Sequence, residues 1–356
     1  MVMVADRIDA VVGVDTHTDT HTAAVLNPAG AVLAQLQVDA DPAGCARLLA
    51  WAGRQAPGPR LLWAVDGARA HGVGLTRILR GAGSWVVEAP KPAAAGRRRG
   101  GKSDALDAVA AARAVLAAGQ LGDPRGDGDR EALRILLTCR RHDADTRTAT
   151  VNLFKSLILT ADDQLRGALR GLSTAAQVRT AAAGWPTGQQ PAEHRIRRTQ
   201  LAELAGRIRD LDTALRANKR QLRTLVAAAM PGLLDIHGVG PVTAATLLTA
   251  WSHPGRVRHE AAFAALAGVN PIPASSGRHT RHRLNRGGDR TLNAALHTIA
   301  KTRRRSHPAT IAYLTRRRAE GKTDREITRC IKRYLARHLY RIMQSHTTNP
   351  PASPIT

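Results

Sequence analysis

Between residues 201 and 225, seam positions recur at alternating intervals of three and four residues, the pattern that most restricts how this chain folds. These positions are Leu201, Leu204, Ile208, Leu211, Leu215, Asn218, Leu222 and Leu225. The spacing places one narrow apolar seam along a helix, and such a seam needs a second helix to cover it. An asparagine within a seam is typical of coiled coils, where it sets register and strand number. We therefore predict a coiled coil with a second protomer; the alternative partner is the chain's own basic segment 130–172.

The first 90 residues alternate between patterns typical of strands and of helices. Their order is β-β-β-α-β-α-β, at residues 11–14, 22–26, 32–38, 42–52, 61–65, 72–79 and 85–88. Periodicity by itself predicts only an α/β domain, and the order matches an RNase H-like (RuvC-like) core. A punctuated stretch, GQLGDPRGDGD, follows a helix predicted from residue 103, and we expect it to end a first domain at residues 1–125.

Four carboxylates stand where such a fold brings side chains together. Asp15 follows the first strand, Asp66 follows the buried strand at 61–65, and Asp104 and Asp107 open the next helix. Carboxylates at the ends of neighbouring strands converge, and residues three apart share one face of a helix. Such oxygen ligands suit Mg²⁺, and two of these ions about 4 Å apart assist phosphoryl transfer.

Two histidines beside Asp15 raise a different possibility. His17 and His21 lie in the segment HTDTH, and imidazole is a common ligand of transition metals. On an extended segment both rings point the same way, and the sequence offers no third ligand nearby. A magnesium site is therefore the better prediction.

Positive charge rises steeply along the chain. The formal net charge is +25, which divides into +3 for residues 1–125, +7 for 126–230 and +15 for 231–356. Arginine predominates in the last third, and its guanidinium group suits bidentate contacts with phosphate. Because a compact segment of this charge repels itself unless a polyanion neutralises it, we expect nucleic acid as the partner. The alternative is that the charges lie on a solvent-exposed surface that binds no nucleic acid, and that a GC-rich gene has raised the arginine content.

The last third opens with a pattern typical of a helix-hairpin-helix element. In IHGVGPVTAATLL, Gly238 and Gly240 permit a tight turn between apolar helices, and Pro241 begins the second helix. Helix starts of this kind bind phosphodiester backbones without reading base sequence. An ordinary turn between two helices is the alternative.

Composition divides the remaining chain into three parts. We predict a helical, coiled-coil region at 126–230, a mostly α-helical domain at 231–345 with basic helices near 292–304 and 324–343, and a disordered proline-containing tail at 346–356. No apolar run is long enough to span a membrane and no secretory signal is recognisable, so we expect a cytoplasmic protein. Three distant cysteines argue against a disulfide framework or a zinc site.

Six motifs follow one another along the chain: GVDTHTDTHTAAVL, WAVDGARAHGVGL, KSDALDA, IHGVGPVTAATLL, LAGVNPIPASSGRHTR and NRGGDRTLNAAL. Together they resemble the DEDD transposases of bacterial insertion sequences, relatives of pilin-gene invertases. The resemblance covers nearly the whole chain. It implies a RuvC-like N-terminal domain that uses Mg²⁺, with Asp15, Asp66, Asp104 and Asp107 at the four acidic positions. The family usually has Glu at the second of these, so Asp66 is one methylene shorter.

The resemblance also implies a nucleophilic serine directly before a glycine, and the matching residue is Ser276 in ASSGRHTRHR. A serine hydroxyl needs activation by a base or a metal, and the loop alone would predict only a Ser-Ser-Gly turn. Gly277 permits close approach of the backbone, and the basic residues after it suit a phosphate. The residues that we expect to bind nucleic acid are Gly238, Gly240, Gly277, Arg278, Arg281, Arg283, Arg286 and Arg290.

The resemblance predicts a transposase in which Ser276 attacks DNA to form a covalent intermediate, assisted by Mg²⁺ at the acidic cluster. It further implies a bridge RNA that pairs with donor and target DNA, an assembly of two or four chains, and action at the bacterial nucleoid. Two alternatives stay open. One is a RuvC-like junction nuclease that uses water, and the other is an inactive nucleic-acid-binding relative, which the shorter Asp66 would favour.

Overall fold

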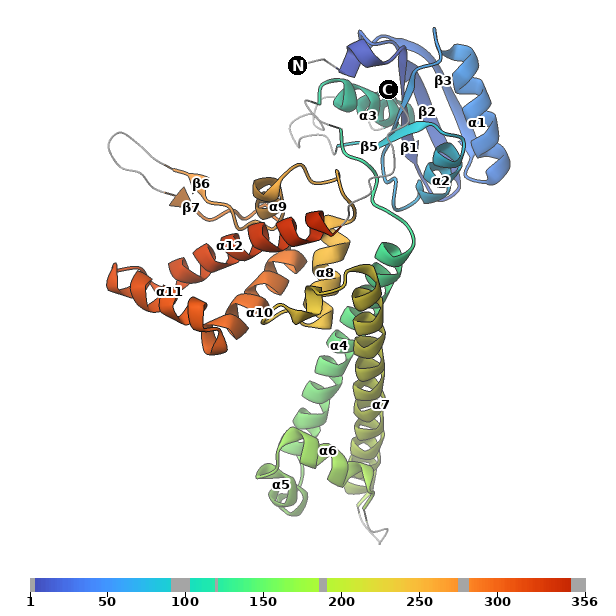
Figure 1. Cartoon of the computed structure of the whole chain (residues 1–356). Helices are drawn as coiled ribbons and strands as arrows, with labels where there is room; N and C mark the ends of the chain where they lie inside the picture. The colour runs from blue at the N-terminus through green and yellow to red at the C-terminus, as the bar shows by residue number, and fades with distance from the viewer. Residues whose placement is uncertain (1–3, 91–102, 119–120, 186–190, 275–281, 347–356) are drawn as a thin grey trace. The chain divides into compact units, whose positions relative to one another are not determined.

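The computed structural model describes residues 4–90, 103–118, 121–185, 191–274 and 282–346 (Figure 1). Contacts divide the chain into two compact units. The first runs to Gly126 and includes His253–Arg256, and the second comprises Asp127–Ser252 and the chain from Val257. All but one residue of the predicted tail at 346–356 lies outside the described residues. Among the helices that the structure describes, none has the length and apolarity needed to cross a membrane.

The first unit is built on a five-stranded mixed sheet. After a 3-10 turn, η1 (Val4–Arg7), come β1 (Ala10–Thr16), β2 (Thr20–Leu26) and β3 (Val32–Asp39), which form an antiparallel meander. The strands β4 (Leu61–Val65) and β5 (Trp85–Glu88) extend the sheet in parallel with β1, giving the order β3-β2-β1-β4-β5. The predicted α/β domain is confirmed, and the strand order is consistent with an RNase H-like core.

Helices cover both faces of this sheet because β1 is apolar on both sides. On one face, Val12 and Val14 pack with α1 (Pro42–Gln55) and α2 (Val73–Gly81). On the other face, Val11 packs with α3 (Asp104–Leu116). The alternation follows the two-residue period of a strand, and burial on both faces explains the unbroken apolar runs.

A glycine lets α3 approach β1 unusually closely. A Cβ atom on Gly13 would lie 2.0 Å from the carbonyl oxygen of Ala108 and 2.7 Å from the backbone nitrogen of Ala112. Both atoms belong to the backbone of α3, so no rotation of a side chain would relieve the clash. Gly13 therefore sets the distance between the sheet and the helix that carries Asp104.

The second unit begins with a long helical hairpin. It consists of α4 (Asp129–Leu159) and α7 (Ala192–Ala229), with the short helices α5 (Asp163–Arg170) and α6 (Thr174–Ala182) between them in the chain (Figure 1). The single helical segment expected at 130–172 is interrupted after Leu159. Asp162 caps α5 by accepting a hydrogen bond from the Leu165 backbone, so it begins a new helix rather than continuing α4.

The apolar seam of α7 is covered from within the same chain. Leu201, Leu204 and Ile208 are buried with residues of α4, α5 and α6. Asn218 donates a hydrogen bond from Nδ2 to the carbonyl oxygen of Leu136, 2.9 Å away on α4. The intrachain alternative thus accounts for the seam, and a coiled coil with a second protomer is not needed to bury it.

The remaining helices pack around α8 (Pro241–Trp251), which is apolar over most of its surface and buried at its centre. They form one core with η3 (Leu233–Asp235), α9 (Glu260–Leu266), α10 (Arg290–Ser306), α11 (Pro308–Ala319) and α12 (Asp324–Ser345). Two short strands, β6 (Ile272–Pro273) and β7 (His282–Arg283), pair antiparallel. The predicted basic helices correspond to α10 and α12, and α11 lies between them where the sequence indicated no helix.

We predict that Gly13→Ala weakens folding of the first unit. The added methyl group must displace α3, and overpacking of this kind costs about 1–3 kcal/mol. Urea unfolding monitored by circular dichroism measures the loss. Gly53→Ala is the matched control, since Gly53 is exposed in α1 and a Cβ there would meet no described atom within 4 Å. Equal midpoints for Gly13→Ala and Gly53→Ala would contradict the packing argument.

Candidate acidic cluster and basic cavity

The carboxylate of Asp15 lies at the end of β1 and is largely buried, with 11% of its side chain exposed. His17 follows two residues later, and its Nε2 is 3.1 Å from Oδ2 of Asp15 and 3.4 Å from Oδ1 of Asp104. One ligand atom from each of these three residues lies within 4.8 Å of the others. Two carboxylates and an imidazole therefore converge on one point beside the sheet.

Asp104 reaches this point because it is the first residue of α3. Ser103 caps the helix by accepting a hydrogen bond from the Leu106 backbone, which fixes where α3 begins. The close contact of α3 with β1 at Gly13 then carries the helix start toward Asp15. Local capping and long-range packing together position the second carboxylate.

The surroundings of Asp15 disfavour the negatively charged form of its carboxylate. Burial raises the pKa of Asp15, and the nearby charges of Asp107 and Asp104 raise it further, whereas His17 acts in the opposite direction. A carboxylate whose charge is penalised by burial and by like-charged neighbours is stabilised by a cation. The donor set of two carboxylates and one imidazole fits a divalent metal ion.

The other two predicted acidic residues lie outside this group of three. The Asp66 backbone is tied to β1: its N–H donates to the Val14 carbonyl at 2.9 Å, and its carbonyl accepts from Thr16 Oγ1 at 2.8 Å. Asp66 itself is exposed, and so is Asp107, one turn into α3. Asp107 still influences Asp15 through its charge.

His17 is a member of the cluster that residue spacing does not predict. The sequence indicates no third ligand beside the two histidines, but Asp104 supplies one from α3. The spacing of Asp15 and His17 did carry the signal, since residues two apart in an extended segment face the same side. His21 is different: it is buried in β2, where its Nδ1 lies 3.0 Å from the Thr20 carbonyl oxygen.

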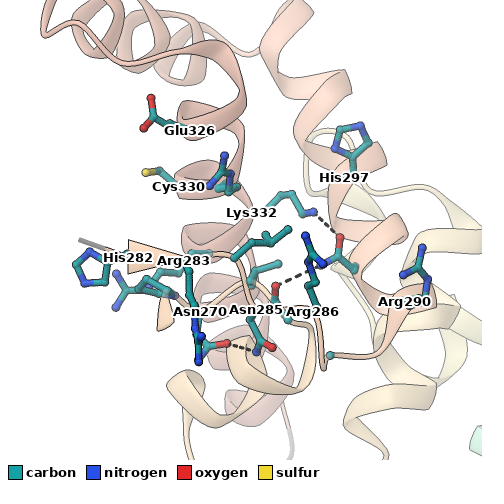
Figure 2. A pocket seen from close by; sticks show the side chains of 18 of the residues that line it. Asn270, His282, Arg283, Asn285, Arg286, Arg290, His297, Glu326, Cys330 and Lys332 are labelled. Carbon is teal, nitrogen blue, oxygen red and sulfur yellow. Dashed lines mark hydrogen bonds between the residues drawn. The ribbon is translucent and has the colours of Figure 1, made fainter. Parts of the chain in front are cut away.

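A second site, in the other unit, is a cavity of about 1250 Å³ between β7, α10 and α12 (Figure 2). The arginines and lysines that line it are Arg283, Arg286, Arg290, Lys322, Arg329, Lys332 and Arg333. Among its described lining residues Glu326 carries the one carboxylate, and this group accepts hydrogen bonds from Thr323 at the start of α12. The cavity thus presents many cations and no uncommitted anion among those residues.

Glycines and asparagines from residues 268–270 and 285–293 pack together among the residues that line this cavity. A Cβ on Gly288 would lie 2.1 Å from the backbone nitrogen of Gly268, so the two chain segments meet backbone to backbone. Asn285 donates to the side chain of Asn270 at 2.7 Å, as Figure 2 shows. Asn293 donates to the Ala267 carbonyl oxygen at 2.7 Å. These contacts hold the lining residues on a rigid frame.

Burial, together with nearby cations at His297, disfavours the charged form of two residues that line the cavity. Burial lowers the pKa of Lys332, whose ammonium group donates to the side chain of Asn293. Burial also lowers the pKa of His297, with further lowering by the charges of Lys332, Lys301 and Arg304. Among the described lining residues the one carboxylate, Glu326, is engaged by Thr323, so the cavity has an excess of positive charge that favours an anion from outside the chain.

The predicted nucleic-acid-binding residues fall into three groups. Arg283, Arg286 and Arg290 line the cavity. Gly238 and Gly240 are not among the cavity's lining residues. Gly238 has a φ of +86°, and a Cβ there would lie 3.1 Å from the Ile299 carbonyl oxygen, so its lack of a side chain serves packing on α10. The remaining three, Gly277, Arg278 and Arg281, lie outside the described residues, and so does the predicted nucleophile Ser276.

Two regions of the chain match known protein families; the acidic cluster lies within the first, and the part of the cavity formed by β7 and α10 lies within the second. Residues 12–161 match a family described as a transposase, of the DEDD type named for IS110, and residues 230–315 match the transposase IS116/IS110/IS902 family. The chain is also 27% identical to the insertion element IS900 uncharacterized 42 kDa protein of Mycobacterium paratuberculosis, over 96% of this chain and 97% of the relative. The chain belongs to the IS110 family of DEDD transposases. The insertion element IS110 uncharacterized 43.6 kDa protein of Streptomyces coelicolor is 34% identical over 127 residues, 35% of this chain and 31% of the relative.

Family membership makes the chain a transposase, an enzyme that cuts and rejoins DNA. The first matched region contains Asp15, His17 and Asp104, and the second contains β7 and α10 but not α12. The acidic cluster of this transposase therefore has the composition of a divalent metal site, and its basic cavity has the charge that DNA requires.

We predict that Asp104→Asn abolishes stabilisation of the transposase by divalent cations. A ligand in hundredfold excess over its Kd stabilises the folded state by about 2.7 kcal/mol, which appears as a rise in Tm. Removing one of two converging carboxylates weakens cation binding and also relieves repulsion at Asp15. Thermal unfolding with and without MgCl2 tests this, with the exposed neighbour Asp19→Asn as control. An undiminished cation-dependent shift in Asp104→Asn would exclude Asp104 as a ligand.

Proposed function

We propose that this chain is an RNA-guided insertion-sequence transposase that cuts and rejoins DNA through a covalent bond to Ser276, assisted by Mg²⁺ at the acidic cluster. The observation that carries the proposal is the basic cavity. Its lining includes β7, and Ser276 lies between β6 and β7 in the chain. A cavity rich in arginine beside the ends of the segment that carries the nucleophile is suited to hold a DNA phosphate.

The acidic cluster supports the second part of the proposal. Asp15 and Asp104 would hold the cation, with His17 in contact with both carboxylates. A bound Mg²⁺ supplies Lewis-acid activation of phosphodiester oxygens. Asp66 and Asp107 flank the group, and we assign them to the same site as outer acidic residues of the DEDD set. The near-complete burial of Asp15 keeps bulk water from one side of the carboxylate.

The bridge RNA is the partner that would supply sequence specificity. Base pairing between a guide and DNA leaves no trace in a protein, which needs only to bind the backbones by charge and shape. The charge of +15 on residues 231–356 is sufficient for such binding. We propose the predicted division of labour, in which residues 1–125 hold the metal site, 126–230 mediate assembly and 231–345 carry the nucleophile, with action at the bacterial nucleoid.

Assembly into a dimer or tetramer would use a surface other than the buried seam. The tip of the hairpin exposes three large apolar side chains: Leu153 at 52%, Leu159 at 71% and Ile196 at 58%. Arg197, next to Ile196, donates to the Leu157 carbonyl oxygen, so Ile196 and the end of α4 lie near each other. Exposed apolar side chains at one end of the hairpin favour contact with a second copy.

The assembly proposal predicts that the double substitution Leu159→Ser and Ile196→Ser weakens self-association at least tenfold. Burying each side chain in a dimer removes apolar surface from water, and a tenfold loss corresponds to about 1.4 kcal/mol. Light scattering during size-exclusion chromatography over a concentration series measures the change. Leu266→Ser is the control, since Leu266 is exposed on α9, away from the hairpin. Unchanged association in the double variant would rule out this surface.

The serine proposal predicts that Ser276→Ala abolishes the covalent protein-DNA adduct. Alanine has no hydroxyl to attack phosphorus, whereas Ser275→Ala leaves the nucleophile in place and serves as the matched control. Purified transposase, Mg²⁺, RNA transcribed from the flanks of the element and labelled DNA are combined and separated on a denaturing gel. An adduct that survives Ser276→Ala excludes this serine. Cut DNA with no adduct in the unmodified chain would instead favour hydrolysis by water at the acidic cluster.

A further inference from the structure

Two tyrosines meet on the surface of the second unit, in a chain that has three tyrosines, two phenylalanines and five tryptophans. Tyr313 on α11 and Tyr334 on α12 contact edge to face, with ring centroids 5.9 Å apart and an interplanar angle of 88°. Tyr334 is 55% exposed, whereas Tyr313 is partly buried against the apolar core. In this pair the Tyr313 ring is therefore fixed against the core, and the Tyr334 ring is open to solvent.

Tyr313 is held in place by its surroundings. The guanidinium groups of Arg316 and Arg317 stand over its ring, 5.5 and 5.8 Å from the centroid. Burial and the neighbouring Cys330, which also hydrogen bonds with it, raise the pKa of Tyr313 to about 12. The ring is therefore neutral at physiological pH and fixed by contacts from both helices. Because Tyr313 is held in place, its edge-to-face contact also restricts the position of the Tyr334 ring.

Tyr334 is not explained by packing of the helix that carries it. Tyr340 lies six residues later on α12 and shows the structural alternative: it is buried, and its hydroxyl donates to the Val257 carbonyl oxygen at 2.6 Å. The packing of α12 on its neighbours rests on buried aliphatic side chains, including Ile327, Ile331 and Leu335. Tyr334 adds exposed aromatic surface that the core does not use.

The position of Tyr334 relates it to the basic cavity. Cys330, one helical turn before Tyr334, and Arg333, directly before it, both line the cavity. Figure 2 shows Cys330 on α12 along with Glu326 and Lys332. Tyr334 thus lies on α12 beside two residues that line the cavity, about one turn, or roughly 5.4 Å, along the helix from Cys330.

We propose that the cavity and Tyr334 together bind one unpaired nucleotide of a DNA strand, with its phosphate among the cavity arginines and its base stacked on the Tyr334 ring. Aromatic side chains bind single strands in this way because every base has a flat π-face. A base inside a duplex is already stacked and cannot use the ring. The inference rests on the proposed function, since cutting and exchanging strands exposes unpaired DNA nucleotides.

The test compares single-stranded and duplex DNA without cleavage. Full-length Ser276→Ala transposase in EDTA is titrated into fluorescein-labelled 12-nucleotide DNA, single-stranded or duplex, and anisotropy gives each Kd. We expect Tyr334→Ala to weaken single-strand binding about tenfold, as loss of one stacked base predicts, and to leave duplex binding unchanged. Tyr334→Trp should retain single-strand affinity. Ile311→Ala, at an exposed apolar residue on α11, is the matched control.

Several results would overturn the inference. Unchanged single-strand affinity in Tyr334→Ala, or an equal loss for duplex, would mean that the ring does not stack on a base. A loss confined to RNA of the same sequence would remove DNA as the occupant. An equal Tm for Tyr334→Ala and the parent confirms that any loss is local. The result is independent of the serine test, because binding here uses the Ser276→Ala background, and an adduct without Ser276 would leave the Tyr334 measurement standing.

Discussion

The approach of α3 to β1 across Gly13 is the contact on which the acidic cluster depends. Asp15 and Asp104 are 89 positions apart in the chain, and they meet because the start of one helix is held at backbone distance from one strand. The buried apolar residues around this contact, such as Val11 and Ala112, offset the cost of gathering carboxylates. Like-charged groups at a functional site are tolerated because the surrounding core is stable without them.

The second unit gathers positive rather than negative side chains, and close backbone and asparagine contacts hold them in place. Its cavity gathers cations on α10 and α12 and commits its one described carboxylate, Glu326, to a helix cap. The asparagine and glycine contacts beneath the lining fix the positions of charges that repel one another. A transposase with one unit arranged for cations and another for polyanions matches the two ionic components of phosphodiester chemistry, a metal ion and a phosphate.

Much of this architecture could be predicted from residue patterns, and the exceptions have physical causes. The strands and the position of Asp15 followed from alternation and from a strand end, and the position of Asp104 followed from the predicted start of a helix after Ser103. His17 was missed because its second partner comes from a helix far along the chain, which spacing cannot reveal. The seam of α7 indicated a partner helix, but seam spacing describes contact geometry and not which chain supplies the contact. The cavity depends on the meeting of Gly268 and Gly288, which no local pattern shows.

The closure of α4 on α7 within one chain separates folding from assembly. A seam shared between chains would leave each newly made copy partly unfolded until it met another. Here Asn218 finds its hydrogen-bond partner on its own chain, so a single copy can fold at any abundance. Under the proposed assembly, joining of copies is a second-order step that responds more steeply than linearly to the amount of protein, and scarce protein would stay folded but unassembled.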